Sequence, residues 1–327
     1  MQPFTRNFGR RWGVAPTLEA GSGRAPIMRG MPELPEVETV ARELREGSAA
    51  RGPSVLGRVI ARVTVRWPRQ IAAPAPRDVE ARLRGQKVLA VGRRGKVIVF
   101  TLSRDVMLVH LRMSGDLTVV PGEAPPDKHA HTVFQFEDGS ELRFSDTRKF
   151  GKVWVVADAA AVLGALGPEP LDDAFTPAVL AERLQGRHRL LKPLLLDQAF
   201  LAGVGNIYAD EALHLAGLHP QRLSDTLTPR EVRALWKALR LALNDGLRHN
   251  GASIDWQYRG GGYQEVLRAY GRAGRECQRP GCTGRIRRIV VGQRSTHFCP
   301  VCQLKRGPGV DWVEAAARRS RRARRED

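Results

Sequence analysis

The pattern of apolar positions changes once along the chain. Between residues 56 and 156, short segments rich in β-branched residues recur between Gly, Pro and Asp, and we expect strands at 59–65, 87–91, 96–100, 107–111 and 132–136. Many short strands of this kind predict a β-sandwich. From residue 176 to 247, apolar residues recur every three or four positions, which predicts helices. Between these regions, 157–166 reads as a short helix and 167–170 as a hinge-like break.

A helix is predicted before the first strand, because apolar residues at positions 37, 40, 41 and 44 have helical spacing. A candidate nucleophile lies just before this helix. If translation starts at Met31 and the methionine is removed, Pro32 becomes a terminal secondary amine. Such an amine can attack an aldehyde-level carbon and form an iminium, with Glu33 beside it to transfer a proton. The helix dipole lowers the pKa of that amine. The alternative is that the prolines only start a helix.

The composition of the chain indicates which class of partner the protein binds. The chain has 327 residues, 42% of them hydrophobic, which is enough for two domains with real cores. Its net charge of +19 favours a polyanion such as nucleic acid, with an anionic membrane surface as the competing partner. No run approaches the roughly 18 apolar residues of a membrane span. Residues 1–30 are rich in Arg without an apolar signal region, so we expect a disordered extension or a start codon assigned too early.

The four cysteines predict a metal site. Cys277 and Cys282 form one close pair, Cys299 and Cys302 the other, and sixteen residues separate the pairs. This spacing is typical of a tetrahedral zinc site, and four thiolates leave no open position for catalysis, so one structural Zn²⁺ is expected. The residues between the pairs predict a β-hairpin that turns at 292–293. Two disulfides are the alternative, which a chain without a secretory signal disfavours.

Taken in order, the motifs resemble those of the bacterial formamidopyrimidine-DNA glycosylases, of the Fpg/Nei family, over residues 32–304. The matching segments are 32–39 (Pro-Glu-Leu-Pro-Glu-Val-Glu-Thr), 93–96 (Arg-Arg-Gly-Lys), 110–115 (His-Leu-Arg-Met-Ser-Gly), 148–151 (Arg-Lys-Phe-Gly), 167–171 (Gly-Pro-Glu-Pro-Leu), 202–209 (Ala-Gly-Val-Gly-Asn-Ile-Tyr-Ala), 270–272 (Tyr-Gly-Arg) and the cysteines. The resemblance implies an α+β multidomain fold: an N-terminal β-sandwich with flanking helices, a helical helix–two-turn–helix domain and a four-cysteine β-hairpin zinc finger. The expected boundaries are an extension at 1–30, a catalytic domain at 31–160, a hinge at 161–171, the helix–two-turn–helix domain at 172–274, the zinc finger at 275–304 and a basic tail at 305–327.

The resemblance also assigns roles to individual residues. It implies Pro32, Glu33, Lys96 and Arg294 as catalytic groups, with Glu36 in support. A glycosylase must extrude its target base and fill the gap, and the residues matching the family's gap-filling set are Met113, Arg148 and Phe150. Further contacts to DNA are implied for His129, Lys149, Lys192 and Asn206, the last as the cap of a phosphate-binding helix. The Gly-rich segment 251–263 is expected to close over the extruded base, without an assigned reading residue.

The implied activity is that of a bifunctional DNA glycosylase and AP lyase that excises oxidised purines by proline Schiff-base chemistry and β,δ-elimination. Its partner is duplex DNA carrying oxidised bases. We expect a cytoplasmic, nucleoid-associated monomer without a membrane partner. One alternative is an endonuclease VIII-like enzyme for oxidised pyrimidines. The other is a noncatalytic zinc-finger DNA-binding protein, which gains weight if residues 1–30 stay attached, because Pro32 is then an amide.

Overall fold

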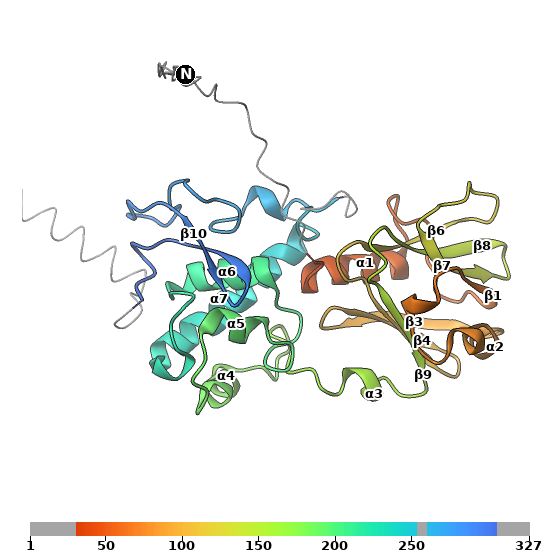
Figure 1. Ribbon diagram of the computed structural model, residues 1–327, viewed down its shortest axis with the longest axis horizontal. Coiled ribbons are helices and arrows are strands. Elements are labelled where there is room, and N and C mark those ends of the chain that lie inside the picture. Colours follow the sequence, from red (N-terminus) through yellow and green to blue (C-terminus); the bar gives the residue numbers. More distant parts are fainter. Residues whose placement is uncertain (1–30, 254–259, 306–327) are drawn as a thin grey trace, which may run out of the picture.

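The computed structural model describes residues 31–253 and 260–305. The predicted extension, the centre of the Gly-rich segment and nearly all of the basic tail lie outside the described residues. Figure 1 shows two lobes side by side, one built around β-sheets and the other around helices. Within the described residues, no helix is long and apolar enough to cross a bilayer.

The first lobe is a β-sandwich, as the sequence predicts. One sheet has the strand order β1-β7-β8-β6 and the other the order β2-β9-β5-β4-β3. All pairings are antiparallel except β2 with β9. The strands are β1 (Ile60–Val65), β2 (Ile71–Ala73), β3 (Val88–Arg94), β4 (Val97–Leu102), β5 (Val106–His110), β6 (Gly115–Pro121), β7 (Ala130–Phe136), β8 (Ser140–Asp146) and β9 (Lys152–Val156). Alternating buried residues of both sheets form one apolar core.

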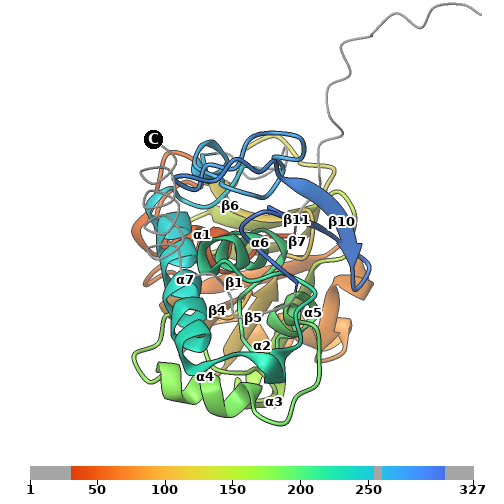
Figure 2. The same ribbon diagram turned by 90° about the vertical axis from the view of Figure 1, so that its left-hand side faces the viewer.

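The second lobe is helical and ends in a hairpin. Its helices are α4 (Pro177–Leu184), α5 (Leu191–Leu196), α6 (Asn206–Ala216) and α7 (Pro229–Arg248), followed by the hairpin strands β10 (Arg287–Val291) and β11 (Arg294–Phe298). The predicted hairpin and its turn are therefore confirmed. Figure 2, viewed toward this lobe, shows the hairpin beside α6, and β11 contacts that helix.

Short helices complete the lobes. In the sandwich these are α2 (Val79–Leu83) and the 3₁₀ turns Pro68–Gln70 and Pro76–Asp78, and in the helical lobe the 3₁₀ turns Ser224–Thr226 and Tyr263–Glu265. The predicted helix at 157–166 is only the single turn α3 (Ala160–Leu163). Gly164 ends this turn, and the proline at 168 disfavours a longer helix. The chain then runs through the hinge-like segment to the helical lobe (Figure 1).

One helix joins the two cores. Helix α1 (Leu34–Glu46) contributes Leu34 to the core of the helical lobe, and Val37, Val40 and Leu44 to the core of the sandwich. Its first turn therefore lies at the boundary between the lobes, where side chains from both can meet it. The predicted helix is confirmed, with Glu33 as the N-cap and Pro32 just before it.

Candidate active site and DNA-binding surface

The carboxylate of Glu33 lies against the N-terminus of α6, 174 residues further along the chain. It accepts hydrogen bonds from the backbone N–H of Ile207 (2.8 Å) and of Tyr208 (3.3 Å). Gly205, the N-cap of α6, makes this approach possible, because a Cβ there would lie 2.2 Å from Cδ of Glu33. The half-buried Pro32 is thereby held next to a carboxyl group at the boundary between the lobes.

The environment of Glu33 suits proton transfer at neutral pH. Burial raises its pKa from 4.5 to about 7, against the opposing effects of the Lys96 charge and of the two helix N–H groups. The neighbouring Glu36 raises it further. A carboxyl group with a pKa near 7 can both give and take a proton at that pH.

Glu36 connects three parts of the chain. Its carboxylate accepts from the backbone N–H of Glu33 (2.9 Å), the hydroxyl of Tyr208 (2.8 Å) and the backbone N–H of Ala252 (2.7 Å). Burial raises the pKa of Glu36, and these hydrogen bonds oppose that effect. Glu36 thus fixes the start of α1, and it also fixes the backbone at the beginning of the Gly-rich segment. This arrangement agrees with the supporting role expected for it.

Lys96 lies near both carboxyl groups, and Arg294, from the other lobe, lies near Lys96. Lys96 follows the turn between β3 and β4 and is only 6% exposed. Burial lowers its pKa, the charges of Glu33 and Glu36 oppose that change, and the charge of Arg294 adds to it. Arg294 itself is exposed at the start of β11. The structure therefore brings together all four residues expected to be catalytic.

The residues expected to fill the gap in DNA lie on two neighbouring loops of the sandwich. Met113 is half-buried between β5 and β6, and Phe150 is 49% exposed between β8 and β9. The guanidinium of Arg148 lies over the ring of Phe150 at 5.0 Å, and the ammonium of Lys149 lies 4.5 Å from the ring of Trp67. Exposed aromatic and cationic groups of this kind are suited to stacked bases and phosphates.

His129 lies near these loops, at the start of β7. It is half-buried and borders a cavity of about 530 Å³, which Ser114 and Asp146 also line. The expected DNA contact of His129 is compatible with this position, and it stays a prediction.

The structure contradicts the expected phosphate contact of Lys192. Its side chain is fully buried, its Nζ forms an ion pair with Asp210 at 2.5 Å, and it donates to the carbonyl of Asn206 (2.8 Å). The sequence motif did not reveal this because Asp210 lies one helix further along the chain. Lys192 therefore joins α5 to α6 in the interior of the lobe and does not reach the surface.

The expected role of Asn206 as a helix cap is also wrong. Gly205 occupies the N-cap position, and the free N–H groups of α6 bind the carboxylate of Glu33 instead of a phosphate. The Asn206 amide donates to the backbone carbonyl of Ser295 at 3.1 Å and so joins α6 to the hairpin. The helix dipole still binds an anion, but that anion belongs to the protein.

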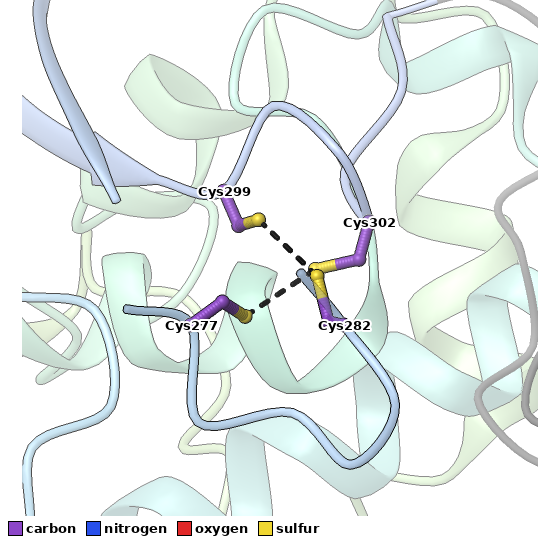
Figure 3. Close-up of side chains that lie close together, drawn as sticks. All are labelled: Cys277, Cys282, Cys299 and Cys302. Carbon is purple, nitrogen blue, oxygen red and sulfur yellow. Dashed lines mark hydrogen bonds between the residues drawn. The ribbon is translucent and has the colours of Figure 1, made fainter. Parts of the chain in front are cut away.

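The four cysteines converge on a common centre (Figure 3). Their sulfur atoms all lie within 4.8 Å of one another, and the Cys277–Cys302 and Cys282–Cys299 distances are 3.8 and 3.7 Å. Zn–S bonds of about 2.3 Å place tetrahedral sulfurs about 3.8 Å apart, whereas a disulfide requires about 2 Å. The geometry fits one structural zinc and excludes the alternative of two disulfides. The metal would fix both ends of the hairpin that carries Arg294.

The sequence predicted no role for two residues that hold these loops, His110 and Asp146. Nδ1 of His110 accepts from the backbone N–H of Arg112 (3.0 Å), and burial lowers the His110 pKa to about 3, so the ring stays neutral. Asp146 is fully buried and bonds to both gap-filling loops. His110 was visible as part of a motif, whereas Asp146 had no local signal beyond its position before Arg148.

A buried carboxyl group beside the Pro32 position, an exposed aromatic ring with cations around it and an arginine-bearing hairpin fit an enzyme that acts on a DNA base. Comparison with known proteins agrees with this class. Residues 31–153 match the Formamidopyrimidine-DNA glycosylase N-terminal domain, 166–257 match its H2TH domain, and 274–304 match the Zinc finger found in FPG and IleRS.

Relatives match along most of the chain. The chain is 47% identical to a formamidopyrimidine-DNA glycosylase of Chloroflexus aggregans and 44% identical to one of Pelotomaculum thermopropionicum, in each case over 84% of this chain and 99% of the relative. A crystal structure of the Lactococcus lactis enzyme in complex with DNA containing FAPY-dG superimposes with a TM-score of 0.76 at 33% identity, over 84% of this chain and all of the other. The chain belongs to the formamidopyrimidine-DNA glycosylase family.

Proposed function

We propose that this protein excises oxidised purines, such as 8-oxoguanine and formamidopyrimidines, from duplex DNA in base excision repair. It then cleaves the DNA at the resulting abasic site. The proposed nucleophile is the amine of Pro32 in a chain that begins at this residue. The observation that carries the proposal is the position of Glu33, whose buried carboxyl group has a pKa of about 7 beside that amine.

The reaction begins when the nitrogen lone pair of Pro32 attacks C1′ of the damaged nucleotide. The bond between C1′ and the base breaks, and the base leaves with that electron pair and takes up the proton that the Pro32 nitrogen loses. The nitrogen lone pair then breaks the bond from C1′ to the ring oxygen, to which Glu33 gives a proton as the sugar opens. The product is an iminium, which withdraws electrons and makes the C2′ proton acidic. Loss of that proton expels the 3′ phosphate, and δ-elimination then expels the 5′ phosphate. Water releases the sugar fragment from Pro32.

We assign Lys96 and Arg294 to the phosphates and protons of the elimination steps. The buried Lys96 has a lowered pKa, which makes it a better proton donor and acceptor than an exposed lysine. Met113, Arg148 and Phe150 fill the space of the extruded nucleotide, and His129 and Lys149 contact the backbone around it. The enzyme is proposed to act on the nucleoid in the cytoplasm, as a monomer.

The test compares a protein that begins at Pro32 with one that begins at Met1, both loaded with zinc. Each is mixed with duplex DNA containing 8-oxoguanine opposite cytosine in the presence of borohydride, which reduces an iminium to a stable amine. We expect a covalent adduct only for the first protein, mapped to Pro32 by peptide mass spectrometry. An intact chain from Met1 that cuts the DNA equally well would overturn the assignment.

Two further substrates separate the alternatives. Faster excision of thymine glycol than of 8-oxoguanine would favour an endonuclease VIII-like enzyme. Tight binding without any adduct, even for the protein that begins at Pro32, would favour a noncatalytic DNA-binding protein.

A further inference from the structure

We propose that Asp146 is a positioning residue that holds the two gap-filling loops and the His129 segment as one unit, so that their side chains enter DNA together. The inference rests on the proposed role of Met113, Arg148 and Phe150. It adds a residue that contacts no DNA and acts through these three.

The carboxylate of Asp146 connects the two loops directly. One oxygen accepts from the hydroxyl of Ser114, next to Met113, and from the backbone N–H of Arg148 (3.1 Å). The other oxygen accepts from the backbone N–H of Gly151 at 2.6 Å. The Ser114 hydroxyl also accepts from the Arg148 N–H (3.0 Å), which closes a ring of hydrogen bonds between the loops.

The backbone of Asp146 extends the same unit. Its N–H donates to the carbonyl of His129 (2.9 Å), and its own carbonyl accepts from Nε2 of His131 (3.0 Å) and from the N–H of Lys149 (3.3 Å). The anchor is fully buried, whereas Phe150 is half-exposed and ready to enter a base stack. A single interior residue therefore bonds to every segment that carries a proposed gap-filling group, through the Ser114 hydroxyl on one loop and through backbone N–H groups on the other.

The chemistry of the anchor is specific to a carboxylate. Among the described residues, no cation forms an ion pair with Asp146, and its side chain is bound only by neutral donors. Burying a charge with only neutral partners is expensive for stability alone. A carboxylate offers acceptors on both oxygens, whereas an Asn amide would turn its NH₂ group toward one of the donors. The close fit leaves no room for a larger residue at 151, where a Cβ would lie 2.5 Å from the Phe144 ring.

A guanidinium that fills the gap, as proposed for Arg148, offers its donors to the base left opposite the lesion. Loosening Asp146 should therefore affect duplex substrates selectively. The test measures Asp146→Asn, Ser114→Ala and the parent protein on 8-oxoguanine opposite cytosine, on 8-oxoguanine opposite adenine, and on single-stranded abasic DNA. The single-stranded substrate has no opposite base and no stack to fill. Single-turnover rates and thermal unfolding midpoints are recorded for each protein.

We expect Asp146→Asn to slow duplex excision by about tenfold or more, with a reduced preference for cytosine over adenine. Cleavage of the single strand should stay unchanged. Ser114→Ala should show a smaller loss of the same kind, and the double variant should lose less than the sum of the two effects, because both act on one network. Asp138→Asn is the matched control, since Asp138 lies beyond the other end of β8, at an exposed turn where it accepts from Ser140.

An equal loss on duplex and single-stranded substrates, or no loss on the duplex, would overturn the proposal. If Asp146→Asn does not fold, Ser114→Ala decides by the same two criteria. Failure of the parent protein to excise 8-oxoguanine would instead count against the proposed function, and it is distinguished by the parent measurement alone.

Discussion

Two regions of this protein each bury a lysine beside carboxylates, and they use it differently. In the interior of the helical lobe, Lys192 and Asp210 are both fully buried and paired at 2.5 Å, and the backbone N–H of His297 adds a further bond to Asp210 (2.8 Å). At the boundary between the lobes, Lys96 is 6% exposed and, among the described residues, its Nζ has no hydrogen-bond partner. Its neighbours Glu33 and Glu36 bind backbone N–H groups instead.

This difference indicates a structural role for the charge of Lys192 and makes Lys96 the candidate for a reactive one. In a buried ion pair such as Lys192 with Asp210, removing the charge of one partner leaves the other uncompensated. The buried Lys96, near carboxyl groups that are bound elsewhere, has a pKa that burial lowers. The pair around Lys192 therefore joins α5 to α6, and the proposed function assigns Lys96, which has no such ion pair within the described residues, to the chemistry.

The largest effect on stability is expected from Lys192→Met. It leaves Asp210 buried without its cation, so the free energy of unfolding should fall by about 3–5 kcal/mol. Lys96→Met removes a desolvated charge and should change that free energy by less than about 1 kcal/mol, while abasic-site cleavage is lost. Urea unfolding of the zinc-loaded proteins measures both.

The double variant Lys192→Met/Asp210→Asn is the control, because it removes both charges and keeps an acceptor for His297. It should recover part of the lost stability. If Lys96→Met destabilised the protein as much as Lys192→Met, the contrast between the two regions would be wrong.

The next effect concerns pH. The pKa of Glu33 is about 7 in the folded protein and 4.5 when unperturbed, so the folded state binds the extra proton between these values. The stability contributed by this proton is fully present below pH 4.5 and is lost as the pH rises through 7; the shift corresponds to about 3 kcal/mol. Glu33→Gln cannot titrate, so the difference in unfolding free energy between the parent and this variant should fall across that range.

Activity gives a second measure of the same group. If Glu33 donates its proton, base excision should decline above pH 7 in the parent protein, and Glu33→Gln should be about 10²–10⁴-fold slower without this decline. A stability difference that is flat between pH 5 and 8 would show that the carboxyl group titrates normally.

The smallest effect is expected at the hinge. Glu169 accepts from the backbone N–H of Gly95 (2.6 Å) and from Arg93 (2.8 Å), so it holds the turn that carries Lys96. Glu169→Gln should cost about 1–2 kcal/mol and slow abasic-site cleavage only a few-fold, with unchanged zinc content. Glu182→Gln, on the exposed face of α4, is the control and should change neither quantity. A cleavage rate unaffected by Glu169→Gln would mean that the turn holds Lys96 without the hinge.

Much of this architecture could be predicted from local patterns. The recurrence of short β-branched segments predicted the sandwich, although β2, β6, β8 and β9 were not recognised individually, because their burial depends on which strands pair across the sheets. The cysteine spacing predicted the hairpin and its metal, since ligands close in sequence must converge on one ion. The order of the motifs predicted that Glu33 would have Pro32 and Lys96 as neighbours, and that Arg294 would lie near Lys96.

The residues that were wrongly predicted or missed share one property, which is a partner far away in the chain. Lys192 was expected at the surface because nothing near it in sequence showed that Asp210 would neutralise it. Asn206 was expected to cap its helix because Asn commonly does so, yet the carboxylate of Glu33 already occupies that position from the other lobe.

By itself, the sequence determined which elements form, where the metal ligands lie and which groups can carry the chemistry, because these depend on residue type and short spacing. Only the tertiary structure decided the charge state and the accessibility of those groups. Burial and distant hydrogen bonds make Glu33 a proton carrier, Lys192 a structural cation and Asp146 an anchor, and these interactions exist only after the two lobes have packed.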